Sequence, residues 1–184
     1  KIIGIRNITD HAGSTTLIYM LKKELEQFYN MDVVAIEINR HDFLYFGDKN
    51  MVSTTDANLM SELVKHKDVS VILIDLNDSS NEGVCGDVLY LIEPSSIKLN
   101  KLMRRNRKIF DELRGKKIIL NQSLLTNKDV MDFEYEGRTK VFYNLPPLND
   151  RERSSVLTDF LSKIGLLNKT EEKEDTKIFG LFKR

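Results

Sequence analysis

The chain alternates between short apolar runs and longer segments in which apolar residues recur every three or four positions. Short continuous runs are typical of buried parallel strands, and the longer spacing is typical of amphipathic helices. Strands are predicted over residues 2–6, 32–38, 69–76, 88–92, 116–120 and 139–143. Helices are predicted over residues 15–29, 56–65 and 127–135, from a cap at Ser95 or Ser96 to residue 113, and from Asn149 or Asp150 to about residue 164.

Six strands that alternate with helices predict an α/β fold, with a doubly wound, mostly parallel sheet flanked by helices. Residues 39–51 are polar and aromatic without clear periodicity, and a loop is expected there. We divide the chain into an α/β domain at residues 1–166, a charged linker at 167–175 and a short amphipathic tail at 176–184.

Composition narrows the partners and the cellular compartment that we expect for the protein. Its 28 basic residues balance 28 acidic ones, so net charge favours no partner class. Cys85 is the only cysteine, which excludes an intrachain disulfide and favours a reducing compartment. No apolar run is long enough for a membrane span, and the first residues carry no signal-peptide pattern. We therefore expect a cytoplasmic protein.

Residues 7–16 (Asn-Ile-Thr-Asp-His-Ala-Gly-Ser-Thr-Thr) lie between the first strand and the first helix. A strand, a short glycine-containing turn and a helix form the layout of a phosphate-binding loop. Such a loop also needs a lysine after its last glycine, to reach the terminal phosphates, and Ser14 stands there instead. The Asp10 carboxylate adds a charge that repels a polyphosphate. The segment has the turn of a phosphate-binding loop but lacks the lysine whose positive charge would bind the terminal phosphates.

These residues resemble the deviant phosphate-binding loop of the ParA/MinD family of P-loop ATPases, whose pattern is Lys-Gly-Gly-Val-Gly-Lys-Thr-Thr. Thr9 and Ser14 fall at the two lysine positions, while Asp10 and His11 replace glycines. The loop matches the pattern at Gly13, Thr15 and Thr16. The order of elements resembles the family to about residue 165, and its atypical TadZ/CpaE branch, which helps to place pilus or secretion machinery at the cell pole, looks nearest.

The resemblance implies a set of site residues. A nucleotide would contact Gly13, Ser14, Thr15, Thr16, Asn121 and Pro146, and a magnesium ion would be held by Thr15 and Asp75. A plain structural reading of Asp75 is that it caps the turn after its strand. The acid that helps to activate water would be Glu37, Asn39 or Asp42, among which the sequence does not choose.

No catalytic residue is assigned. We expect ATP and magnesium binding to be weak or absent, since the sequence offers only Arg6, or an arginine of a second subunit, as a nearby cation.

Two segments are candidate interaction surfaces. The helix after Pro94 carries a basic stripe at Lys98, Lys101, Arg105 and Lys108, which suits DNA phosphates or an acidic partner. A solvated outer face is favoured, because interleaved aromatic residues are missing. The tail places Ile178, Phe179, Leu181 and Phe182 among basic residues, which suits either a membrane surface or a protein groove.

The leading functional hypothesis is a non-hydrolysing scaffold or positioning factor for a membrane-associated machine. It would bind protein partners and form a homodimer. It would also contact the inner face of the membrane peripherally. The alternatives are an active or weak ATPase, and a nucleotide sensor without turnover.

Overall fold

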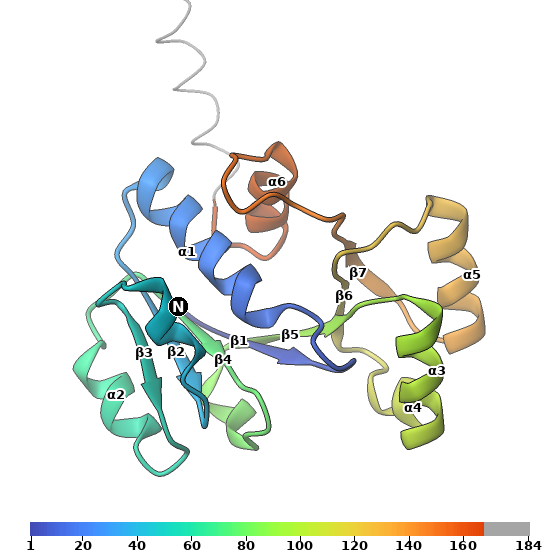
Figure 1. Ribbon diagram of the computed structural model, residues 1–184, viewed down its shortest axis with the longest axis horizontal. Coiled ribbons are helices and arrows are strands. Elements are labelled where there is room, and N and C mark those ends of the chain that lie inside the picture. The colour runs from blue at the N-terminus through green and yellow to red at the C-terminus, as the bar shows by residue number, and fades with distance from the viewer. Residues whose placement is uncertain (168–184) are drawn as a thin grey trace, which may run out of the picture.

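The computed structural model describes residues 1–167, which form three layers with a sheet between two layers of helices (Figure 1). The sheet has seven strands, all paired in parallel, in the order β3-β2-β4-β1-β5-β6-β7. The strands are β1 (Ile2–Asn7), β2 (Val33–Ile38), β3 (Met51–Thr54), β4 (Val71–Asp75), β5 (Asp87–Ile92), β6 (Lys117–Leu120) and β7 (Val141–Asn144). The predicted doubly wound parallel sheet is confirmed.

The helices cover both faces of this sheet (Figure 1). Their bounds are α1 (Ser14–Tyr29), α2 (Leu59–Lys65), α3 (Ser96–Arg105), α4 (Ile109–Glu112), α5 (Asn127–Gly137) and α6 (Ser155–Lys163). Apolar residues of α1 and α6 join one core cluster with one face of the strands. The other face packs against α2 beside β2 and β4, and against α3, α4 and α5 beside β5 and β6. Alternate residues of each central strand are thereby buried on opposite faces.

The sheet has one strand more than the sequence predicts. Met51–Thr54 forms the edge strand β3 and pairs only with β2. Its first and last residues are buried, the two between them are partly exposed, and Ser53 and Thr54 are polar. A strand this short lacks the continuous apolar run that identified the central strands.

Three helices are shorter than predicted. The segment from Ser96 divides at Asn106, whose extended backbone (φ −143°, ψ 99°) separates α3 from α4. The Asn106 side chain accepts a hydrogen bond from the Lys108 amide at 3.0 Å and so fixes the break. Helix α6 begins at Ser155, capped by the hydroxyl of Ser154, rather than at residue 149 or 150. Helix α2 begins at Leu59, three residues after the start predicted at Asp56.

The proposed linker and tail lie outside the described residues, except for Leu167, which is buried in the main core cluster. Across residues 1–167, no helix combines the length and the apolar character that a membrane crossing requires.

From the packing of the core we predict which substitution destabilises the domain. Phe160 of α6 is fully buried, and its ring centroid lies 5.0 Å from that of Tyr143. We expect Phe160→Ala to lower the free energy of unfolding by about 3–5 kcal/mol in urea denaturation, because it leaves a cavity. Leu124→Ala, at a side chain that is 86% exposed, is the matched control and should change it by less than about 0.5 kcal/mol. Equal effects would contradict this account of the core.

Candidate functional site

The phosphate-loop segment lies at the carboxyl edge of the sheet. Strand β1 is flanked by β4 on one side and β5 on the other, so the loop after Asn7 sits between the ends of two neighbouring strands. Helix α1 starts directly after it, at Ser14. Ligands of open parallel sheets bind at this edge, and the candidate site is therefore where the fold class puts it.

A buried carboxylate joins the start of α1 to the end of β4. The Ser14 hydroxyl donates to the Asp75 carboxylate, whose oxygens lie at 2.9 and 3.0 Å, and the Thr15 hydroxyl donates to Asp75 Oδ2 at 2.9 Å. Asn7 also holds Ser14, because its Nδ2 donates to Ser14 Oγ at 2.8 Å and its Oδ1 accepts from the Ser14 amide at 3.2 Å. The structure thus brings the two expected magnesium ligands, Thr15 and Asp75, together.

Burial raises the pKa of Asp75 above its ordinary value, since the carboxylate is almost fully removed from solvent. The hydrogen bonds from Thr15 and Ser14 lower the pKa and offset part of this effect, and the nearby Glu37 carboxylate raises it further. The negative charge of Asp75 is therefore costly in the folded protein.

The two residues that the sequence resemblance matches to lysines, Thr9 and Ser14, carry hydroxyls directed into the protein. Ser14 is buried against Asp75, and Thr9 is buried with its Oγ1 accepting a 2.8 Å hydrogen bond from the Glu93 amide at the end of β5. These side chains tie the loop to the two strands that flank it. Neither supplies a cation to a ligand.

The loop backbone keeps a conformation that favours glycine at one position. Gly13 has φ 94°, and a Cβ there would lie 2.9 Å from Asn121 Nδ2. Asn121 Nδ2 in turn donates to the Ala12 carbonyl at 2.7 Å. His11 takes a left-handed conformation, with φ 51°, where the family pattern has glycine. A residue larger than glycine is tolerated at His11 because its side chain is exposed.

A small cavity adjoins the loop on the side where the resemblance places the nucleotide base. Its volume is about 190 Å³, and its lining includes Gly13, Thr16, Asn121 and Pro146. These are four of the six residues expected to contact a nucleotide. The other two, Ser14 and Thr15, lie in the Asp75 cluster at the start of the same helix.

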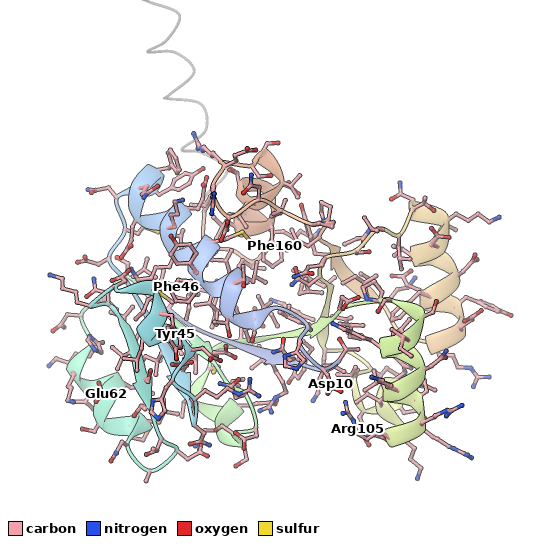
Figure 2. The ribbon with its side chains drawn as sticks, viewed as in Figure 1. Asp10, Tyr45, Phe46, Glu62, Arg105 and Phe160 are labelled. Atoms are coloured by element: carbon pink, nitrogen blue, oxygen red, sulfur yellow. The ribbon has the colours of Figure 1, made fainter. Side chains whose placement is uncertain are left out.

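Two cations of the basic stripe lie against the loop, which the sequence did not predict. Arg105 of α3 forms an ion pair with Asp10 at 2.9 Å (Figure 2), and its NH2 donates to the Ile8 carbonyl at 3.4 Å. Lys98 forms an ion pair with Glu93 and donates to the His11 carbonyl at 3.3 Å. Arg105 holds the pKa of Asp10 below its ordinary value, so this carboxylate is ionised at neutral pH. The one signal in the sequence that could have indicated these contacts is the chain order, in which α3 follows β5. Strand β5 pairs with β1, so α3 starts near the loop.

Arg6, the cation that the sequence offered, is not at the loop. Its guanidinium contacts Glu82 at 2.5 Å and the carbonyls of Asn77 and Ser79, so it holds the segment after β4. Of the two cations expected from the sequence, Arg6 projects toward the segment after β4, and Lys98 and Arg105 contact the loop instead. An arginine from a second subunit stays a prediction.

The three candidates for the water-activating acid also separate in the structure. Glu37 is fully buried and accepts from the amides of Asp42 and Phe43 and from Ser53 Oγ. Asn39 Nδ2 donates to Asp56 at 2.9 Å, while Asp42 is exposed. Glu37 is therefore occupied in holding the start of a 3₁₀ helix, Asp42–Phe46.

A larger cavity, of about 1030 Å³, lies elsewhere, at the amino ends of β6 and β7. It contains none of the expected site residues. Six of its lining residues are basic: Arg114, Lys116, Lys117, Arg138, Lys140 and Lys163.

Solved structures give the fold a known counterpart. The structure of a ParA family ATPase from Chlorobium tepidum TLS aligns with a TM-score of 0.56 at 12% identity, covering 92% of this chain and 92% of that chain. The chain has the fold of a ParA-type ATPase. MinD from Aquifex aeolicus aligns with a TM-score of 0.49 at 14% identity, over 89% of this chain and 86% of that chain. The sequence matches no family profile and no curated protein.

Two oxygen-bearing side chains at the loop match what magnesium requires from a protein. The Thr15 hydroxyl and the Asp75 carboxylate are oxygen donors 2.9 Å apart, and magnesium is commonly held by one or two carboxylates together with ligand phosphates and water. Within residues 1–167, no group of three or more His, Cys, Asp or Glu side chains could hold a metal by itself. The residues fit an ion that arrives with phosphates, while the usual loop lysine is missing.

The raised pKa of Asp75 predicts a pH dependence of stability. Between the unfolded pKa of about 3.8 and the higher folded pKa, the folded state binds more protons, so stability contributed by this group falls as pH rises. We expect the free energy of unfolding of wild type to decline across this window relative to Asp75→Asn, which cannot ionise. Urea denaturation from pH 4 to pH 8 measures the difference. Parallel profiles for the two proteins would show that Asp75 ionises normally.

Proposed function

We propose that this protein is a ParA/MinD-type protein that does not hydrolyse ATP and that acts as a scaffold or positioning factor for a membrane-associated machine. The observation that carries the proposal is the inward orientation of Thr9 and Ser14, the residues at the two lysine positions. Phosphoryl transfer depends on positioned cations that stabilise charge on the phosphates. A loop that directs hydroxyls at its own strands does not supply that stabilisation from its own side chains.

Exposed apolar side chains support protein partners. Leu44 and Tyr45 on the 3₁₀ helix, and Met60 and Val64 on α2, are each at least 60% exposed. The two elements pack against opposite faces of the sheet, so these residues form two separate exposed pairs, each of which can take part in a protein contact. A homodimer, and pilus or secretion machinery as the larger assembly, are the partners that the family resemblance suggests.

The candidate membrane contact is the tail, with Ile178, Phe179, Leu181 and Phe182 among lysines and arginine. Such a segment partitions to an interface through apolar burial and attraction to anionic lipid. One short segment binds weakly, and a dimer would present two. The proposed location is the cytoplasm, at the inner face of the membrane.

A nucleotide sensor without turnover is the second candidate function. It is favoured by the cavity that Gly13, Thr16, Asn121 and Pro146 line, and by the pairing of Thr15 with Asp75. In this function a bound nucleotide would change which partner the scaffold holds, and hydrolysis would not be needed.

Turnover tests the absence of hydrolysis. We expect phosphate release from ATP and magnesium to be indistinguishable between wild type, Asp75→Ala and a protein-free blank. Thermal melting of each protein without ligand controls for folding. Turnover by wild type that Asp75→Ala abolishes would establish an ATPase and overturn the proposal.

Liposome co-sedimentation tests the tail. We expect wild type to sediment with vesicles containing anionic lipid, and the full chain carrying Phe179→Ser and Phe182→Ser to stay in the supernatant, because the substitutions remove the apolar contacts. Vesicles of neutral lipid are the control for the basic residues. If both proteins behave alike on anionic vesicles, the tail is not a membrane contact.

A further inference from the structure

The loop lacks its own cations, yet two cations reach it from another element. Lys98 and Arg105 are seven residues apart on α3, which is about two helical turns, so they project from the same face. Lys98 contacts the His11 carbonyl, and Arg105 contacts the Ile8 carbonyl and Asp10. Positive charge therefore lies along the loop even though the loop sequence carries none of it.

The position of α3 follows from the topology. Strand β5 pairs directly with β1, and α3 begins four residues after β5 ends. The Thr9 hydroxyl accepts a hydrogen bond from the Glu93 amide, which joins the loop to the end of β5. Helix α3 follows the same strand end, so the loop and α3 are both held there. This arrangement holds the two cations beside the loop without any residue from a second subunit.

Each cation is now paired with a carboxylate. Asp10 accepts from Arg105, and Glu93 pairs with Lys98. The Asp10–Arg105 pair is more than half exposed on both side chains, so it contributes little to stability and can exchange partners. A phosphate group competes well for a guanidinium, because it offers several acceptor oxygens at higher charge.

The loop also offers backbone donors. Within the described chain, the amides of Asp10, His11 and Gly13 have no hydrogen-bond acceptor. Amides in a turn with left-handed residues, such as His11 and Gly13, converge on anions. The loop thus has backbone amides without an acceptor, and two side-chain cations contact its carbonyl oxygens.

We propose that this loop binds a polyphosphate anion that Lys98 and Arg105 hold in place of the missing loop lysines, with the Asp10 and Glu93 carboxylates giving way to the ligand. The ligand class is pyrophosphate or the phosphate chain of a nucleotide. This inference deepens the second candidate function and rests on the absence of hydrolysis proposed above. Asp10 acts as an internal competitor for the anion site.

Calorimetric titration with sodium pyrophosphate, in EDTA at low salt, tests the anion site on the full chain. We expect Lys98→Gln and Arg105→Gln each to weaken binding roughly three- to tenfold, because each removes a charge-assisted contact. Asp10→Asn should tighten binding by about threefold or more, because it removes a repelling charge and frees Arg105. The control is Arg104→Gln, an exposed cation of the same helix for which no loop contact is seen, and it should stay within about twofold.

The signs of these effects separate ligand binding from a structural role. Weakening or no change by Asp10→Asn would overturn the inference, as would equal effects of Arg104→Gln and Arg105→Gln. No heat with wild type and with Asp10→Asn, both folded by circular dichroism, would also overturn it and would leave a non-hydrolysing scaffold standing. A parallel titration with ATP identifies which compound supplies the phosphates. Equal affinity for ATP and pyrophosphate supports free polyphosphate as the ligand, and tighter binding of ATP supports a nucleotide.

Failure of the proposed function has a different readout. ATP turnover would overturn the absence of hydrolysis, on which this inference rests, even if the charge variants changed pyrophosphate affinity as expected. Turnover and affinity are measured separately, so the two failures are distinguishable.

Discussion

The carboxylate of Asp75 is the point on which the loop depends. It lies at the end of a central strand and binds the first two hydroxyls of α1, so strand, loop and helix are fixed to one another. Burial destabilises its charged form, and the hydrogen bonds from the two hydroxyls offset part of this destabilisation. A lysine at residue 14 would place an ammonium where this network now closes. Ser14 is therefore engaged within the protein, because its hydroxyl binds Asp75 and its amide binds Asn7.

Thr9 is held in a comparable way on the other side of the loop. Thr9 is buried and binds the Glu93 amide, which fastens the loop to the opposite neighbouring strand. A loop held on both sides can keep the shape of a phosphate cradle without a ligand. Its shape is then an outcome of packing and hydrogen bonding, and it does not by itself establish catalysis.

Charge near the loop comes from α3. In the sequence, Lys98 and Arg105 belonged to a basic stripe that was read as a solvated face, with DNA as a less favoured partner. In the structure both contact the loop, and their carboxylate partners sit at the loop and at the end of β5. Residues about ninety positions apart meet because β5 pairs with β1.

The sequence by itself determined the parallel α/β fold, the central strands and the position of the loop between β1 and α1. The family resemblance named Thr15 and Asp75 as magnesium ligands, and the hydrogen bond between them is a finding of the structure. Continuous apolar runs and helical spacing are local signals, because burial on both faces of a strand requires them. Local signals failed at β3, a short polar edge strand, and at Asn106, where a side chain and not a glycine or proline ends α3.

Only the tertiary structure decided which cations face the loop and which hydroxyls turn inward. Those contacts depend on strand order, on the sheet face that each residue occupies and on the position where α3 packs, and none of these is encoded in a local pattern.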